Sequence, residues 1–217
     1  MNRSIFVFIV IFSFYVCSAQ SSYNPDSISK TSSIAKDNNE FYNLFVQVKP
    51  EELNENVFKD VGTDWTCITS GNDSLFNSMT ASFGGWGILF GKPATWCFLR
   101  SNRYTLELIR KHKKYTMSYF DAKYKDQLLL FGSKSGRNSN KMKETKLTHI
   151  ITPNGSISYK EARLIIECEL VEITTVNPND FFDESAKKFV IDGYNDTKDY
   201  HKLVFGEIKG IWIRKEK

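Results

Sequence analysis

Two long β-type segments near the C-terminus constrain the fold more than any other feature of the sequence. Residues 162–176, "ARLIIECELVEITTV", and residues 201–213, "HKLVFGEIKGIWI", are rich in β-branched and aromatic side chains. The first of them is long enough for a full barrel strand. Gly206 and Gly210 in the second predict bends or a close approach of the backbone to a neighbour. The chain is therefore expected to fold around a β-sheet.

Shorter segments of similar composition precede these two, and turn residues separate them. Asn154-Gly155 is a two-residue hairpin signal, and Asn102 and Asp121 are placed to cap two helices. The remaining expected strands are residues 64–71, 93–99, 114–120, 150–151 and 157–159, and the expected helices are residues 51–60, residues 103–111 and one after Asp121. Six or seven strands, mostly antiparallel, with two to four inserted helices predict a mainly β fold, a closed or partly closed barrel in one domain.

The N-terminus has the three-part layout of a secretory signal peptide. A single positive charge, Arg3, precedes the almost wholly apolar 12-residue segment Ile5–Val16, and small residues follow. This segment is shorter than the roughly 20 residues that a transmembrane helix needs. We expect cleavage after Ala19 and export to the periplasm or the medium. A lipoprotein cleaved before Cys17 is the alternative.

The domain organisation follows from this N-terminus. Residues 1–19 are the predicted signal peptide. Residues 20–40 are rich in Ser, Asn, Asp and Lys and predict a disordered tether. Residues 41–217 form the expected domain, and no further apolar segment predicts a transmembrane helix in the mature chain.

Charge and cysteine content narrow the class of protein. The net charge of the 217-residue chain is +4, or +3 without the signal peptide, and the lysines are scattered, so the sequence does not predict nucleic-acid binding. Cys67, Cys97 and Cys168 each lie in an apolar strand-like segment, which favours buried structural thiols. A single disulfide between two of them is the alternative, and the sequence does not choose the pair.

The common local signatures of enzymes are absent. His112, His149 and His201 lack the spacing of metal ligands, so no dedicated metal site is predicted. The sequence has no GxSxG nucleophile elbow, no GxGxxG after a strand and no GxxxxGK[ST] phosphate loop.

Three clusters of small, hydroxyl or basic residues remain as candidate binding elements. In residues 77–87, "NSMTASFGGWG", the hydroxyls of Ser78, Thr80 and Ser82 alternate with Met79 and Ala81, so in a strand they share one face. A planar ligand that forms hydrogen bonds suits such a strand. The alternative is an ordinary strand with its polar face in solvent, leading into a tight Gly-Gly turn.

The other two clusters are basic. Residues 100–105, "RSNRYT", follow a strand and open a helix, where guanidinium groups and free backbone N–H groups favour an anion such as phosphate. Residues 132–137, "GSKSGR", combine an open backbone with two positive charges. A solvated helix-capping turn and a flexible basic loop are the alternatives. Taken together, the three clusters favour one phosphorylated planar ligand.

In this order and at this spacing, the clusters resemble the flavin reductase-like family of FMN-binding split barrels. The resemblance spans Val57 to Ile213. It is carried by residues 76–82, "FNSMTAS", by Gly84-Gly85-Trp86-Gly87, by Gly91-Lys92-Pro93, by the two basic clusters, by Lys141, Glu144 and Thr145, and by the stretch from Asp199-Tyr200-His201 to Gly206-Glu207-Ile208.

The resemblance implies a site for FMN. Residues 77–82 would lie along the isoalloxazine ring and the ribityl chain, and the two basic clusters would hold the phosphate end. The cofactor-binding residues implied are Asn77, Ser78, Met79, Thr80, Ala81, Ser82, Arg100, Arg103, Tyr104, Thr105, Ser133, Lys134 and Ser135. Trp86 would cover the flavin or a dimer neighbour, or belong to the core. His201 would approach the nicotinamide or the flavin edge as a catalytic residue, or be a structural histidine.

The resemblance also implies a homodimeric oxidoreductase. Hydride would pass from NAD(P)H to the flavin without a protein acid or base, which agrees with the lack of a catalytic constellation. The predicted signal peptide departs from cytoplasmic relatives and puts the electron donor in question, so a protein or membrane partner is an alternative to NAD(P)H. An exported flavin-binding or electron-carrier protein without enzymatic activity is the alternative function, and a β-rich secreted domain without a cofactor is the third.

Overall fold

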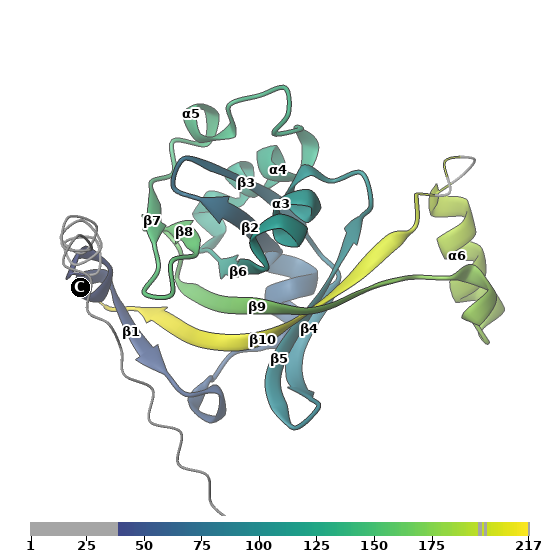
Figure 1. The fold of residues 1–217 in the computed structure, drawn as a ribbon, viewed down its shortest axis with the longest axis horizontal. Coiled ribbons are helices and arrows are strands. Elements are labelled where there is room, and N and C mark those ends of the chain that lie inside the picture. The colour runs from purple at the N-terminus through teal and green to yellow at the C-terminus, as the bar shows by residue number, and fades with distance from the viewer. Residues whose placement is uncertain (1–38, 195–196, 198, 217) are drawn as a thin grey trace, which may run out of the picture.

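Figure 1 shows the structure, a computed structural model that describes residues 39–194, 197 and 199–216. The predicted signal peptide lies outside the described residues, and so does the predicted tether except for its last two residues. Those two residues begin a short helix, residues 39–44. No helix in the described part of the chain is long and apolar enough to span a bilayer.

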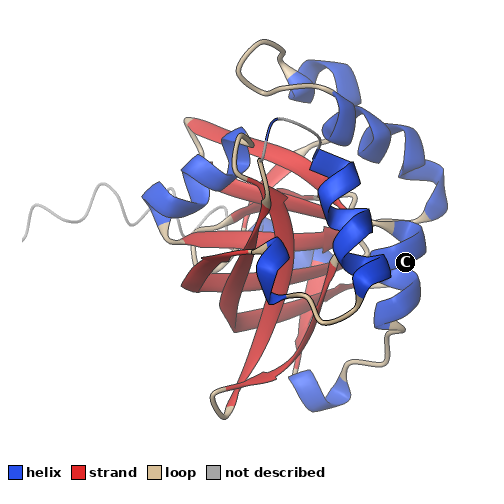
Figure 2. Cartoon of the chain, turned by 90° about the vertical axis from the view of Figure 1, so that its right-hand side faces the viewer, coloured by secondary structure: helices blue, strands red, loops and turns tan. Residues whose placement is uncertain are grey.

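The architecture is an antiparallel sheet that curls on itself, with helices around it (Figures 1 and 2). The strands are β1 (Phe45–Val48), β2 (Thr66–Asn72), β3 (Leu75–Ala81), β4 (Gly84–Leu89), β5 (Lys92–Arg100), β6 (Lys114–Tyr119), β7 (His149–Ile151), β8 (Ile157–Tyr159), β9 (Leu164–Thr175) and β10 (His201–Arg214). Eight of them form one sheet in the order β3-β2-β6-β9-β10-β5-β4, with β1 beside β10, and β7 and β8 form a separate hairpin.

Helical segments fill the connections between the strands. They are the 3₁₀ turns Pro50–Glu52, Ala122–Tyr124 and Pro178–Asp180, the π-helical turn Asp60–Asp64, and the helices α2 (Val57–Lys59), α3 (Tyr104–His112), α4 (Lys125–Ser133), α5 (Lys141–Thr145) and α6 (Glu184–Tyr194). Helix α6 links β9 to β10 and stands away from the body of the sheet (Figure 1).

The fold class predicted from the sequence, mainly β with inserted helices, is confirmed, but some elements differ. The segment Gly84–Leu89 is strand β4 rather than a tight turn, because it pairs with β5 from Gly84↔Cys97 onward. With β1 also present, the described residues hold ten strands rather than six or seven. Helix α3 starts after Arg103, so the predicted cap Asn102 is wrong. Asp121 stands at the N-cap position of the 3₁₀ turn that leads into α4, as predicted, but its side chain makes no capping hydrogen bond.

Strand β10 bends where its two glycines lie, as the sequence predicts. Its register against β9 shifts between Phe205 and Gly206 and again before Gly210. At Gly206 a Cβ atom would lie 2.5 Å from the hydroxyl oxygen of Tyr115 and 2.9 Å from Cβ of Cys168, so only glycine fits there. The strand therefore bends around a packed core.

Both faces of the sheet are buried at its centre. Neighbouring residues of one strand belong to opposite faces, so Ile165 lies in one apolar cluster while Leu164 and Ile166 lie in the other. Cys67, Cys97 and Cys168 are buried and free, as the thiol interpretation predicts. Burial raises the pKa of each thiol, which keeps the three cysteines protonated and unreactive.

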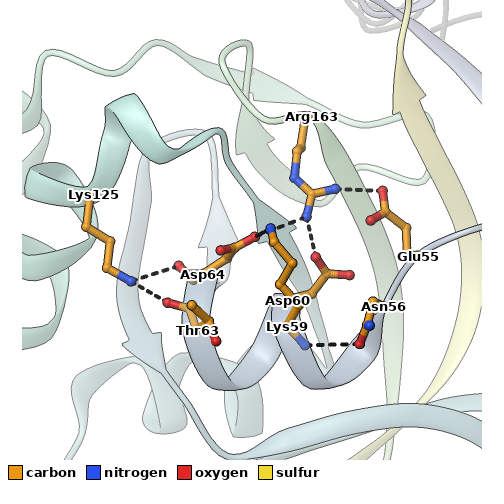
Figure 3. A network of polar contacts seen from close by, with 8 residues as sticks. All are labelled: Glu55, Asn56, Lys59, Asp60, Thr63, Asp64, Lys125 and Arg163. Carbon is orange, nitrogen blue, oxygen red and sulfur yellow. Dashed lines mark hydrogen bonds and ion pairs between the residues drawn. The ribbon is translucent and has the colours of Figure 1, made fainter.

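A network of charged side chains fastens the segment before β2 to the sheet (Figure 3). Arg163 donates to Glu55 at 2.6 Å and to the buried carboxylate of Asp60. Lys125 donates to the Thr63 carbonyl at 2.5 Å, and its ammonium lies 3.2 Å from the centre of the Trp65 ring. Burial raises the pKa of Asp60, and the positive charge of Arg163 opposes the rise, so the arginine favours the ionised form of this buried acid.

Glu167 of β9 is a buried acid, and its hydrogen bonds within the described part of the chain include none from a cationic side chain. Its side chain accepts hydrogen bonds from Thr152, from Asn154 at 2.9 Å and from the Trp212 indole at 2.8 Å. Burial raises its pKa above the ordinary value of 4.5, and the three donors only partly offset this effect.

Glu167 makes the stability of the fold depend on pH. Because its pKa is raised on folding, the contribution of Glu167 to the free energy of unfolding is most favourable below pH 4.5 and is lost as the pH rises through the folded pKa. We expect Glu167→Gln to remove this loss and to be at least as stable as the wild type at pH 7. Urea unfolding between pH 4 and pH 8 measures the effect. The exposed neighbour Glu169→Gln is the control, and a wild-type slope in Glu167→Gln would contradict the assignment.

Candidate functional site

Two adjoining cavities lie between β3, the start of α3 and the segment that joins α4 to α5. Their volumes are about 390 Å³ and about 430 Å³. The residues that line both are Asn77, Gly136, Arg137, Asn138 and Lys141. The two cavities are therefore halves of one groove, which we call the β3 groove.

The close contact between Gly136 and Asn77 separates the two halves of the β3 groove. A Cβ atom at position 136 would lie 1.9 Å from Oδ1 of Asn77, so any other residue would have to displace the Asn77 side chain or the loop. Asn77 in turn donates from Nδ2 to Oγ1 of Thr105 at 2.8 Å. This chain of contacts joins β3, α3 and the loop after α4 into one wall.

The 390 Å³ half of the groove has a positively charged rim. Arg103, Lys134 and Arg137 line it. Lys134 pairs with Glu144, and Arg137 pairs with Glu107, so both cations are fixed in place. Nε of Arg103 is buried and has no hydrogen-bond partner among the described residues. A buried N–H of this kind is costly unless it meets an acceptor, and a ligand oxygen would satisfy it.

The first turn of α3 adds backbone donors to the same half. Tyr104 and Thr105 line the cavity, and Arg103, the residue before the helix, makes no side-chain cap. The first N–H groups of a helix have no partner within the helix and favour an anion. The charge and the donors of this half suit a phosphate group.

Lys141 forms the floor between the two halves. It is 6 % exposed, and its ammonium donates to the Ser78 carbonyl at 2.8 Å and to the Phe131 carbonyl at 3.0 Å. Burial lowers its pKa to about 8, Cys67 opposes the change, and Arg103 adds to it. Lys141 thus holds β3 against the end of α4. It was not among the predicted site residues, although the segment that contains it contributed to the resemblance.

The alternation along β3 is as predicted. Asn77 and Met79 line the 390 Å³ half, and Ser78 lines the 430 Å³ half. Oγ of Ser78 lies 2.5 Å from the Tyr159 hydroxyl, and Thr80 donates to the Leu128 carbonyl at 2.5 Å. The hydroxyls of Ser78 and Thr80 are therefore engaged within the protein.

The rest of the predicted strand residues stand apart from the groove. Ala81 is buried in the core, and Ser82 is exposed just beyond the end of β3. Trp86 packs against the core with its ring 5.5 Å from that of Tyr119, which supports the core alternative for this tryptophan.

From the two basic clusters, the structure brings Arg103, Tyr104, Thr105, Lys134 and Ser135 together around the 390 Å³ half. It places two others elsewhere. Ser133 is exposed in the last turn of α4, 3.4 Å from the Leu130 carbonyl, and Arg100 donates to the Gly193 carbonyl at 2.9 Å. The tight turn closed by the hydrogen bond from Arg103 N to Arg100 O reverses the chain between the two arginines. Neither Arg100 nor Ser133 lines the groove.

His201 lies on the Arg100 side of that turn. The two residues are paired across β10 and β5, and the imidazole packs among the rings of Phe83, Phe98 and Tyr194 at 6.0, 6.5 and 5.3 Å. Burial lowers the pKa of His201 to about 4, and the charges of Arg100 and Arg103 add to the effect. His201 is therefore neutral at pH 7.

The pKa of His201 is directly measurable. In an NMR titration of the histidine ring protons, we expect one of the three histidines to titrate near pH 4, and that signal to vanish in His201→Gln. Because Arg100 contributes less than burial, Arg100→Gln should raise this pKa but leave it below 6.5. Since the pKa falls on folding, His201 also lowers stability as the pH drops from 6.5 towards 4. A titration near pH 6.5 in the wild type would refute this environment.

Comparisons with known proteins identify the family and the fold of the chain. A model of the flavin reductase like domain matches residues 58–217. An FMN-binding protein from Thermus thermophilus is 17% identical, with a TM-score of 0.54 over 77% of this chain and 80% of that one. The flavoredoxin of Desulfovibrio vulgaris (Miyazaki F) is 19% identical, with a TM-score of 0.54 over 76% of each chain. An FMN-binding domain of a flavin reductases-like enzyme from Shewanella baltica OS155 is 14% identical, with a TM-score of 0.55 over 78% and 76%.

No curated protein sequence matches the chain. At these identities the solved structures establish the fold alone, whereas the domain match covers most of the length. The chain belongs to the flavin reductase-like family and has its split-barrel fold, with a sheet that is not closed.

Proposed function

We propose that the protein binds FMN without a covalent bond, with the phosphate in the 390 Å³ half of the β3 groove, and acts as a flavin-dependent oxidoreductase. The observation that carries this proposal is the buried, unpartnered Nε of Arg103 beside the first turn of α3. The close fit of Gly136 against Asn77 supports it, because it keeps the backbone next to the groove bare of side chains.

The residues of this chain would hold and orient the ligand. Arg103 and the first N–H groups of α3 would bind phosphate oxygens, while Lys134 would add charge from the opposite wall. Lys141 would lie beneath the ligand, where it holds β3 against α4 through the carbonyl oxygens of Ser78 and Phe131. Bound FMN supplies the redox chemistry, since it accepts and donates hydride or single electrons. The protein then needs no acid–base pair of its own.

Two wider expectations belong to the same proposal. We infer a homodimer, because Ile88 and Phe90 at the tip of the β4–β5 hairpin are 70 % and 79 % exposed and suit burial against a second copy. Sedimentation velocity tests this. The electron donor is NAD(P)H, or a protein or membrane partner if the predicted signal peptide directs the protein out of the cytoplasm.

FMN and riboflavin together test the phosphate site. We expect FMN to bind the purified protein more tightly than riboflavin, which lacks the phosphate. Arg103→Gln should weaken FMN binding about tenfold, because it removes a charge-assisted hydrogen bond, and should leave riboflavin binding unchanged. Fluorescence quenching of the flavin measures both. The control is Arg110→Gln, an exposed arginine later on α3. If Arg103→Gln weakened FMN and riboflavin binding equally, or if the wild-type protein did not bind FMN, the proposal would be refuted.

Reduction of the bound flavin tests the oxidoreductase and its donor. We expect the yellow holoprotein to bleach under anaerobic conditions with NADH or NADPH, as followed by its visible spectrum. Bleaching with dithionite alone would leave FMN in place and point to the alternative of an electron carrier that is reduced by a partner.

A further inference from the structure

A separate cavity lies where the last residue of α3, the start of β6 and the turn of the β7–β8 hairpin meet the middle of β9. Its volume is about 360 Å³, and eight of its nine lining residues have a polar or charged side chain. We call it the α3-end cavity. It shares no lining residue with the β3 groove, which lies at the opposite end of α3. The polar side chains around it include those of His112, Lys114, Asn154, Ser156, Glu167 and Glu169.

Two of these residues have opposite charges and adjacent places in the sheet, but they do not form an ion pair. Lys114 of β6 and Glu169 of β9 are Cα partners, and opposite charges in direct register across two strands attract each other. Instead, the Lys114 ammonium donates to the Gly155 carbonyl at 2.6 Å and to the Asn154 carbonyl at 3.3 Å. The Glu169 carboxylate lies 3.0 Å from Nζ of Lys209. The two charges are thus held apart, and both residues line the cavity.

Both charged groups keep hydrogen-bonding capacity for a ligand. An ammonium has three N–H donors, and Lys114 uses two of them on the hairpin turn. Within the described residues, the ion pair of Glu169 is made with Lys209 through Oε2, which leaves Oε1 open. Lys209 also pairs with Glu207 at 2.9 Å, so its charge is shared between two carboxylates.

His112 adds a polar atom that lacks a partner. It is the last residue of α3, and its Nε2 is buried without a hydrogen-bond partner among the described residues. Burial lowers the pKa of His112, and the charges of Lys111 and Lys114 add to the effect, so the imidazole is neutral at pH 7. A buried ring nitrogen is costly unless it forms a hydrogen bond, and a ligand in the cavity would supply one.

The arrangement of charges selects the class of ligand. A cavity of roughly 300–1,000 Å³ with a few convergent polar groups is typical of a small-molecule site. A purely anionic ligand would meet the carboxylate of Glu169, and a purely cationic one would meet the ammonium of Lys114. A molecule with both charges can form a charge-assisted hydrogen bond with each of the two residues. The cavity therefore favours a zwitterion.

We propose that the α3-end cavity binds a free α-amino acid with a polar side chain, with its carboxylate on Lys114 and His112 and its ammonium on Glu169. Asn154 and Ser156 line the same cavity and would form hydrogen bonds with the side chain of the amino acid. The site goes beyond the proposed function, since none of these residues lines the β3 groove.

L-Serine, L-serinamide and L-glycerate are matched probes, because the amide lacks the carboxylate and glycerate has a hydroxyl in place of the ammonium. Binding is followed by NMR on the full protein through the ring protons of His112, which His112→Gln assigns among the three histidines. We expect L-serine to shift these signals to saturation, and the other two probes to bind at least tenfold more weakly. Equal binding of all three probes, or no binding of L-serine, would overturn the proposal.

Glu169→Gln tests the ammonium contact without disturbing the core, because this side chain is 59 % exposed. It should weaken L-serine binding about tenfold and leave L-glycerate binding unchanged. Glu172→Gln is the matched control, since Glu172 is exposed later on β9 and does not line the cavity. If Glu169→Gln weakened both probes equally, Glu169 would have only a structural role, and the proposal would be overturned.

Lys114→Gln tests the carboxylate contact in the same way. It should weaken L-glycerate binding about tenfold and leave L-serinamide binding unchanged. Equal weakening of both probes would contradict the proposal. Lys114 also holds the hairpin turn, so circular dichroism must show that the variant is folded. If it is not, the result for Glu169→Gln decides.

FMN titrated into the same samples separates this proposal from the proposed function. We expect FMN to bind the wild type and Glu169→Gln equally and not to displace L-serine. FMN binding without L-serine binding would refute only the amino-acid site, and the reverse would refute only the flavin site. Displacement of L-serine by FMN would place the probe in the β3 groove and overturn the inference.

Discussion

The pairing of β10 with three neighbours is the constraint on which the rest of the structure depends. Along its 14 residues β10 lies against β9, while its first half also pairs with β5 and its last residues with β1. A strand this long in a twisted sheet must bend to close around a core. The two register shifts beside Gly206 and Gly210 supply the bends.

The curl of the sheet creates the β3 groove. It brings β3, the start of α3 and the loop after α4 together, although they are far apart in sequence. Direct contacts then fix the three segments: Asn77 to Thr105, Asn77 against Gly136, and the buried Lys141 to the backbone of β3 and α4. A buried ammonium is tolerated here because two carbonyl oxygens replace its water. These contacts tie the three segments into one wall of the groove.

The surface beneath α6, where β9 ends and β10 begins, is apolar, unlike the charged β3 groove. Strands β9 and β10 carry α6 away from the body of the sheet (Figure 1), and an aromatic pocket forms beneath the helix. One short turn assigns Arg103 to the charged groove and Arg100 to this apolar pocket. Two arginines three residues apart therefore meet surroundings of opposite polarity, and both depress the pKa of His201.

The sequence by itself determined the fold class and the long strands with their glycine bends, because alternation and glycine placement act locally. It did not determine β4, because the two adjacent glycines of this segment predicted a turn, whereas in the structure the segment is a strand that pairs with β5. It also could not assign the hydroxyls of Ser78 and Thr80, since their partners come from distant segments. Nor could it separate Arg100 from Arg103, or show the burial of Lys141. Only the tertiary structure decided these points, because side-chain direction and burial depend on contacts made far along the chain.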